Sequence, residues 1–324
     1  MVLSRRFLRF LRTAALAAVF SLGLAGIALA EEITWTGNTG DKSWATTGNW
    51  DPDTAVPGGS DTAIFDKNAE ILSLSGAVTV KELKFTGDAT LTLKDPGYAL
   101  TVKKLSVAEG KKAIVNSAGD DEKFIIADTN SLIEVGDNAL LTLAGKKVKG
   151  AGVLTLSGGG TLDLNAVLTT ATSLELKDGS TLNVNVANAL PNLTNTVKVT
   201  KGNLTLGYNL PAAVKRVEVT EGVLTLAGGV KIGNGSKTEP DGAVDLKAAG
   251  HLVLSGDLTL KELKTVEGSK ITANGKTLTV KPAAAFGLDA EIDKGTLSLD
   301  VTDGQMATLS KDVASVVFNG KSGG

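Results

Sequence analysis

The chain of 324 residues is 42% hydrophobic, yet only 4% of its residues are aromatic and none is cysteine. Its core must therefore be built from aliphatic side chains, and disulfides and cysteine-based metal sites are excluded. Beyond the first thirty residues the basic side chains are all lysines apart from Arg216. Because arginine is the usual residue for phosphate and base-edge contacts, no nucleic-acid partner is expected.

The first thirty residues have the layout of a secretory signal peptide. Four arginines between residues 5 and 12 precede the apolar run "TAALAAVFSLGLAGI", which is too short for a comfortable membrane span. The small residues Ala28 and Ala30 then precede Glu31, so we predict cleavage after Ala30, which makes residues 1–30 the signal peptide. Loss of the four arginines changes the formal net charge from −2 to −6. The sequence predicts an exported protein whose mature chain has no membrane span.

The middle of the chain repeats a sequence motif with an offset of 20 residues. The stretch "VKVTKGNLTLGYNLPAAVKR" (197–216) is followed directly by "VEVTEGVLTLAGG" (217–229), in which the aliphatic residues are kept and the charges change. Related copies cover residues 174–196 and 244–264. Repeat periods of this size are typical of solenoids, in which each repeat packs only against its neighbours.

Each copy alternates aliphatic and polar residues with period two, which predicts β-strands. No part of the mature chain shows a sustained apolar stripe of helical period, so crossover helices are not expected. An antiparallel sandwich also has closely spaced strands, but its sequence does not repeat a two-strand motif at a constant offset. We therefore predict an all-β fold, a parallel β-helix (β-solenoid) of about ten coils over residues 71–300.

The substitutions between copies support this stacking. Outward positions in successive coils read Glu175, Lys198, Glu218 and Asp245, and positions near a corner read Asp178, Lys201 and Glu221. The inward positions are always aliphatic, namely Leu176, Val199, Val219 and Leu246. Stacked strands lie about 4.8 Å apart, so changes of sign between neighbouring coils favour attraction.

The segment that opens the mature chain differs from the repeats. Residues 33–65, "ITWTGNTGDKSWATTGNWDPDTAVPGGSDTAIF", hold all three tryptophans of the protein. We expect residues 31–70 to cover the first coil with aromatic bulk. The residues singled out as a candidate motif are Trp35, Trp44, Trp50, Pro57, Asp61 and Phe65.

This segment resembles the opening of bacterial autotransporter-type passenger proteins and related surface β-helix proteins. The resemblance is carried by Trp35-Thr36-Gly37, Trp44, Asn49-Trp50, Val56-Pro57 and Asp61-Thr62-Ala63-Ile64-Phe65. It implies a right-handed parallel β-helix, export, and a role at the cell surface such as adhesion or biofilm formation.

The last residues are expected to form a C-terminal cap or tail over 301–324. The stretch "DVASVVFNGKSGG" lacks the alternating ten-residue strands of a translocator barrel, so the resemblance is to a passenger without that barrel. Two outcomes stay open for this tail. Either a short helix folds back over the last coil, or Leu297 and Leu299 form an open sheet edge through which solenoid ends associate.

Catalysis is not expected from this sequence. The single histidine, His251, and the lone Arg216 of the mature chain fall at different positions of their coils, and the acidic groups at Asp51, Asp53 and 119–123 lie in loop-like stretches. We predict no catalytic residue, no cofactor and no metal.

The predicted function is that of a secreted, non-enzymatic module at the cell surface or in the extracellular space of a bacterium, with a structural or adhesive role. Expected partners are further copies of the chain, bound through the solenoid ends, or a surface or matrix polysaccharide or protein. The alternative is a β-helix that binds or cleaves carbohydrate, a hypothesis that rests on analogy of fold.

Overall fold

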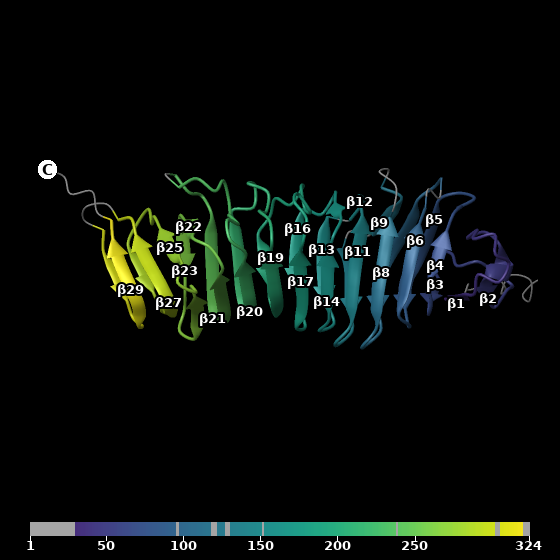
Figure 1. Ribbon diagram of the computed structural model, residues 1–324, viewed down its shortest axis with the longest axis horizontal. Coiled ribbons are helices and arrows are strands. Elements are labelled where there is room, and N and C mark those ends of the chain that lie inside the picture. The colour runs from purple at the N-terminus through teal and green to yellow at the C-terminus, as the bar shows by residue number, and fades with distance from the viewer. Residues whose placement is uncertain are drawn as a thin grey trace, which may run out of the picture.

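The computed structural model describes residues 30–94, 97–117, 122–126, 130–150, 152–237, 239–301 and 305–319. Apart from Ala30, the predicted signal peptide lies outside these ranges. The described chain is a β-solenoid of about eleven turns, a rod with its first strands at one end and its last strands at the other (Figure 1). The described ranges contain no α-helix and a single 3₁₀ turn, η1 (Thr47–Asn49). The prediction of an all-β solenoid is confirmed.

Three ladders of parallel strands run along the rod, and each defines one face. The first face contains β1 (Glu32–Trp35), β3 (Thr62–Phe65), β5 (Val78–Phe85), β7 (Leu100–Val107), β10 (Asn130–Val135), β13 (Val153–Ser157), β16 (Ser173–Leu176), β18 (Val197–Val199), β20 (Arg216–Leu226), β21 (Ala243–Leu254) and β23 (Glu262–Lys264). After a break it continues with β26 (Phe286–Leu288) and β28 (Ala307–Leu309).

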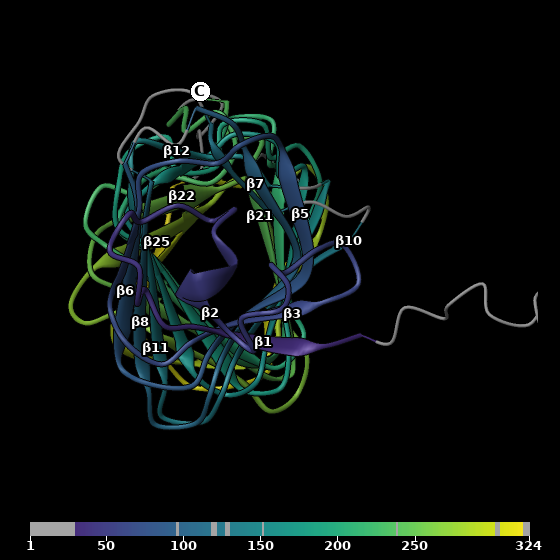
Figure 2. The same ribbon diagram turned by 90° about the vertical axis from the view of Figure 1, so that its right-hand side faces the viewer.

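The second face contains β4 (Ala69–Ile71), β6 (Ala89–Leu93), β8 (Lys112–Ser117), β11 (Leu140–Gly145), β14 (Thr161–Leu164), β17 (Ser180–Val184), β19 (Gly202–Leu206), the later parts of β20 and β21, β24 (Ser269–Thr272) and the start of β27 (Ala290–Leu299). Seen along the rod from its N-terminal end, β6, β8 and β11 line up on one side (Figure 2).

The third face contains the first parts of β5 and β7, then β9 (Phe124–Ile126), β12 (Lys147–Val148), β15 (Val167–Leu168), β22 (Leu258–Leu260), β25 (Thr277–Val280), the end of β27 and β29 (Val313–Phe318). Between β15 and β22 this face is made of loops. Leu190 and Leu210, which recur in Leu-Pro pairs, point their side chains into the core from these loops. Proline lacks the N–H that a ladder requires, so no strand forms there.

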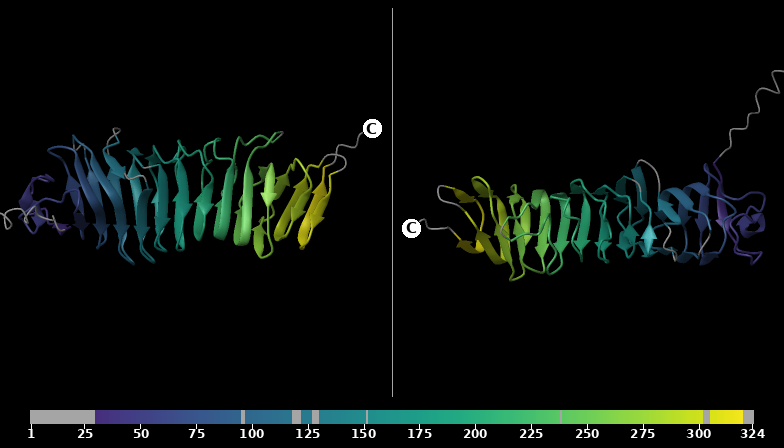
Figure 3. Two further views of the ribbon diagram at one scale, coloured as in Figure 1. Left: turned by 180° about the vertical axis from the view of Figure 1, so that it is seen from behind. Right: turned by 90° about the horizontal axis from the view of Figure 1, so that it is seen from above.

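The register of the first face matches the sequence pattern residue by residue. Glu175 lies opposite Lys198, Lys198 opposite Glu218, and Glu218 opposite Asp245. Their inward neighbours are at most 1% exposed; they are Leu176, Val199, Val219 and Leu246. Stacking therefore explains why the copies keep their aliphatic residues, because each turn supplies the core of the next. Two further views show the same stack from behind and from above (Figure 3).

The predicted corner column needs one correction. Lys201 does face Glu221 in the next coil, with 3.7 Å between its Nζ and the nearer carboxylate oxygen. Asp178, however, lies one residue out of register, because Ser180 is the residue opposite Gly202. Asp178 adopts a left-handed backbone conformation with φ of 54° at this corner, which shifts the alignment by one residue.

The glycines at the corner between the first and second faces are required by close backbone approach. Gly202 and Gly222 stack directly on one another, with φ of 154° and 131°. A Cβ added to Gly222 would lie 1.8 Å from the carbonyl oxygen of Gly202. The stack leaves no space for a side chain at this corner.

We therefore expect Gly222→Ala to lower the free energy of unfolding by about 2 kcal/mol or more, because the backbone of two coils must move apart. Gly76→Ala is the matched control, since Gly76 has open space around its Cβ position and no positive φ. Urea denaturation of both variants measures the difference. Equal losses would show that the Gly202–Gly222 contact is not the constraint.

At the C-terminal end the described chain continues the solenoid. Strands β28 and β29 form where the sequence also allowed a short helix, and the described residues 305–319 contain no helix. The expectation of an open edge at Leu297 and Leu299 is wrong, because these residues pair with Val316 and Phe318 of β29 and are fully buried. The three valines and the phenylalanine of "VASVVF" favour the extended conformation of this further strand.

Candidate functional site

The N-terminal motif residues come together in a buried aromatic cluster. The ring centroids of Trp35 and Trp44 lie 4.9 Å and 4.6 Å from that of Trp50, both in edge-to-face arrangements. Phe65 lies beneath them, with its centroid 5.9 Å from that of Trp50. The short strand β2 (Trp50–Asp51) pairs antiparallel with β1 and carries Trp50 over the first coil. This cluster covers the end of the core.

Hydrogen bonds hold Trp50 and Trp44 in place. The Nε1 of Trp50 donates to the carbonyl oxygen of Trp44 at 2.8 Å, and the Nε1 of Trp44 donates to the carbonyl oxygen of Pro57 at 3.4 Å. Asp61 accepts hydrogen bonds from the backbone N–H groups of Gly58 and Glu31. The singled-out motif residues thus close the end of the rod.

Asp41 organises the loop of this cap and was not among the residues predicted from the sequence. Its carboxylate accepts hydrogen bonds from the Oγ1 of Thr46 at 2.6 Å, the backbone N–H of Ser43 at 3.0 Å and the Nδ2 of Asn49 at 2.6 Å. These donors, with that of Thr46 the strongest, hold the pKa of Asp41 well below its usual range. The carboxylate is therefore ionised under ordinary conditions.

A lowered pKa means that Asp41 stabilises the folded cap fully above its unfolded pKa of about 3.9, and that this contribution is lost as the pH falls. We expect Asp41→Asn to destabilise the cap at about pH 6 and to cost less at about pH 2.5. Intrinsic tryptophan fluorescence during urea unfolding reports this region selectively. A difference between wild type and variant that does not shrink in acid would contradict the assignment.

Arg216 is engaged in ion pairs on the first face. Its Nη1 lies 2.5 Å from a carboxylate oxygen of Asp245, and its Nη2 lies 2.5 Å from one of Glu262. The guanidinium therefore reaches across two coils and offsets the like charges of Glu218 and Asp245, which stack on one another. Hydrogen bonds from Lys264 and Arg216, opposed by burial, lower the pKa of Glu262.

His251 lies on the second face, on a different strand surface from Arg216. Its Nε2 is 2.9 Å from the Oγ1 of Thr272, and burial together with the charge of Lys270 lowers its pKa. The structure does not bring His251 and Arg216 together. In the described part of the chain, no group of three or more histidine or acidic side chains is placed to hold a metal ion.

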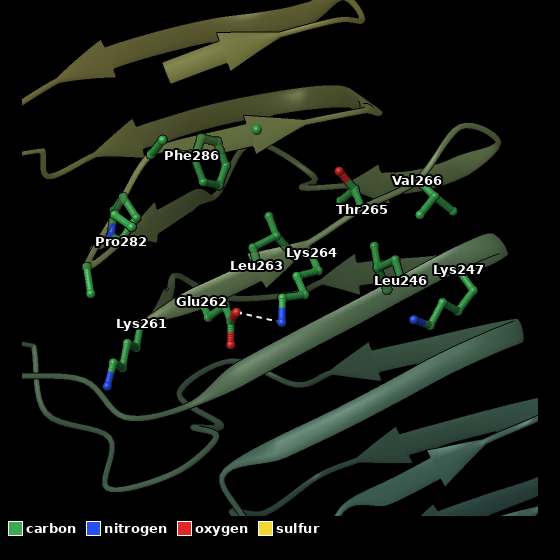
Figure 4. A pocket seen from close by; sticks show the side chains of 14 residues that line it. Leu246, Lys247, Lys261, Glu262, Leu263, Lys264, Thr265, Val266, Pro282 and Phe286 are labelled. Carbon is green, nitrogen blue, oxygen red and sulfur yellow. Dashed lines mark ion pairs between the residues drawn. The ribbon is translucent and has the colours of Figure 1, made fainter. Parts of the chain in front are cut away.

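The break in the first face forms a lateral groove. β23 pairs with β21, and β26 pairs with β28, but β23 and β26 do not pair with each other. A hollow of about 490 Å³ lies between them, with Leu263 and Phe286 buried below it (Figure 4). Lysines and small apolar residues line it, including Lys247, Lys261, Lys264, Pro282 and Ala283–Ala285.

Pro282 and the three alanines after it explain this break. Proline cannot donate to a ladder, and the exposed alanines present little side chain for packing. Glu262 lies in the groove with its carboxylate 2.8 Å from the Nζ of Lys264 (Figure 4). This groove was not predicted from the sequence, in which "KPAAA" at 281–285 was the available signal.

The stacked coils, the covered N-terminal end and the ion-paired lateral faces define a parallel β-solenoid. Among curated proteins the chain is similar to the "Adhesin BmaC autotransporter" of Brucella suis biovar 1 (strain 1330), with 26% identity over 322 residues. The similarity covers 93% of this chain and 8% of that protein. It confirms the resemblance to an autotransporter-type passenger that the sequence indicated.

No family model matches the chain, and no solved structure matches it. Within the described ranges, no helix has the length and apolar character that a membrane crossing needs.

Proposed function

We propose that this protein is an exported, non-enzymatic adhesive module of the bacterial surface or the extracellular space. The observation that carries the proposal is the long β-solenoid with its extended lateral faces, together with its similarity to an autotransporter adhesin. A rod of stacked coils presents a large, rigid surface for multiple weak contacts. Export through the predicted signal peptide, with cleavage after Ala30, belongs to the same proposal.

The distribution of reactive groups supports a binding role over a catalytic one. Arg216 is engaged by two carboxylates, and His251 has a hydroxyl partner and lies on another face. A polysaccharide-cleaving enzyme needs an acid and a base that converge on one bond. The acid in the lateral groove, Glu262, is already engaged by Arg216 and Lys264.

Adhesion is tested with beads coated with the purified protein and exposed under flow to extracellular-matrix gels. We expect several-fold more retained beads than with beads carrying the heat-unfolded protein, because the folded lateral faces make the contacts. Incubation of the protein with the same gels should release no sugar fragments. Retention equal to that of the heat-unfolded protein would contradict the adhesive role, and release of sugar fragments would favour the carbohydrate-cleaving alternative.

A further inference from the structure

A second groove adjoins the first across a corner of the rod. It lies on the third face as a hollow of about 750 Å³, bounded by the loop 229–237, by β22, β25 and β27, and by Asn319, which follows β29. Lys261 follows β22 and lines the first groove, whereas Lys281 follows β25 and lines the second. The N–H of Lys281 donates to the carbonyl oxygen of Leu260, so the two lysines stack in adjacent coils at this corner.

Hydroxyl groups form the floor of the second groove. Thr259 stacks on Thr279, and Thr279 stacks on Ser298, with Thr277 beside them. The Nδ2 of Asn319 donates to the Oγ of Ser298 at 2.7 Å and closes this row. Neighbouring rungs lie about 4.8 Å apart, close to the length of one sugar unit in an extended chain. The floor therefore offers a regular series of donors and acceptors to sugar hydroxyls.

The overhanging loop is braced by its own hydrogen bonds. The N–H of Asn234 donates to Asp241 at 2.5 Å, and the N–H of Ser236 donates to the Oδ1 of Asn234 at 2.9 Å. Asp241 is also paired with Lys215, at 3.2 Å. The loop thus holds the exposed Lys231 and Lys237 at the rim of the groove. The interactions that brace it do not involve the ammonium groups of these two lysines.

More lysines than acidic residues line the two grooves. Their acids are already engaged: Asp257 accepts from the N–H of Thr277, Asp300 pairs with Lys281, and Glu262 pairs with Arg216 and Lys264. The ion pairs found among the described residues include none of the four lysines Lys231, Lys237, Lys247 and Lys261. The joined grooves therefore present positive charge that lacks a partner within the described chain.

We propose that the joined grooves bind an acidic, carboxylate-bearing polysaccharide that crosses the corner at Lys261 and Lys281. The four lysines pair with its carboxylates, the hydroxyl rows bind its ring hydroxyls, and the small apolar side chains at 282–285 contact the C–H faces of the sugars. This proposal rests on the proposed adhesive function and names the class of ligand.

Other polyanions fit the grooves less well. A single-stranded nucleic acid needs aromatic side chains for base stacking, yet the aromatic residue that lines the grooves, Phe286, is 5% exposed. The nearby Arg216 is occupied by two carboxylates. An acidic peptide would leave the hydroxyl rows of the third face without matched partners.

The test uses the purified protein and oligogalacturonate of about eight units as a probe, with binding followed by calorimetry. The groove variant is Lys231→Ala/Lys237→Ala/Lys261→Ala, and the matched control is Lys67→Ala/Lys103→Ala/Lys111→Ala. All six lysines are exposed, and none is in the ion pairs found among the described residues. Both variants change the net charge of the protein by the same amount. A difference in affinity between them therefore reflects where the lysines lie, not the total charge.

We expect the groove variant to weaken binding by about tenfold or more and the control by about twofold or less. Replacement of the same three groove lysines by arginine should restore most of the affinity, and the methyl-esterified oligomer should not bind. Equal losses in both variants, no binding by the wild type, or tighter binding of oligo-glutamate or oligothymidylate would overturn the proposal. Beads carrying the groove variant that still adhere would overturn this ligand while leaving the adhesive function standing.

Discussion

Leu206→Asp is expected to lower the free energy of unfolding by about 4 kcal/mol. The side chain of Leu206 is fully buried and stacks between Val184 and Leu226, the inward residues of the coils on either side. A carboxylate at this position has no donor and no water, so it must either stay charged in an apolar core or take up a proton. Both cost stability at neutral pH.

Thr205→Lys is the matched control for this substitution. Thr205 is the preceding residue, is partly exposed and stacks between Asn183 and Thr225 on the outer surface. A lysine there reaches water, so the loss should stay below about 1 kcal/mol. Thermal and urea melts of the two variants give the comparison, and equal losses would mean that the inward and outward sides have been exchanged.

Trp50→Ala is expected to cost about 3–5 kcal/mol at the N-terminal end of the rod. Trp50 is 1% exposed and contacts Trp35, Trp44 and Phe65. Because a solenoid coil contacts only its neighbours, we expect this loss to loosen the first coils while the middle of the rod stays folded. Amide hydrogen exchange should therefore rise in β1 to β4 and stay unchanged near β17 to β19.

Tyr208→Ala serves as the control for loss of an aromatic ring, since the side chain of Tyr208 is 45% exposed and lies at mid-rod. It should leave exchange at the N-terminal end unchanged. Uniform loss of protection along the whole rod after Trp50→Ala would contradict the idea that stability is added coil by coil.

The stacking register could be predicted from the sequence because two periods coincide in it. Period-two alternation fixed which residues of "VKV" and "LTL" point inward, and the 20-residue offset fixed which coils lie opposite one another. Val197 and Val217 therefore align in the structure as they do in the sequence. Where backbone conformation changes at a corner, as at Asp178, the pattern gives no register and the prediction slipped by one residue.

The grooves could not be predicted in the same way. Lys237 lies in the insertion "GNGSKTEPDG" (233–242), which interrupts the repeat, and Lys231 lies just before it. Lys261 and Lys281 come from the two coils after it. Their approach depends on how the loop folds back over the third face, which no periodicity encodes. The gap between β23 and β26 exists because Pro282 interrupts the ladder of hydrogen bonds between them. A single proline is a weak sequence signal for such a gap.

Cysteine cross-linking across neighbouring coils tests the stacked-coil structure most directly, because the chain has no cysteine of its own. Thr205 and Thr225 lie directly opposite each other, at a strand separation of about 4.8 Å that permits a disulfide. Thr205→Cys/Thr225→Cys should therefore form an intramolecular disulfide readily on mild oxidation. Thr205→Cys/Val223→Cys places the thiols on the same surface but two residues out of register, at more than about 7 Å between Cα atoms, and should not. Equal cross-linking of both pairs, or cross-linking of the second pair alone, would contradict the solenoid register on which the grooves and the proposed adhesive faces depend.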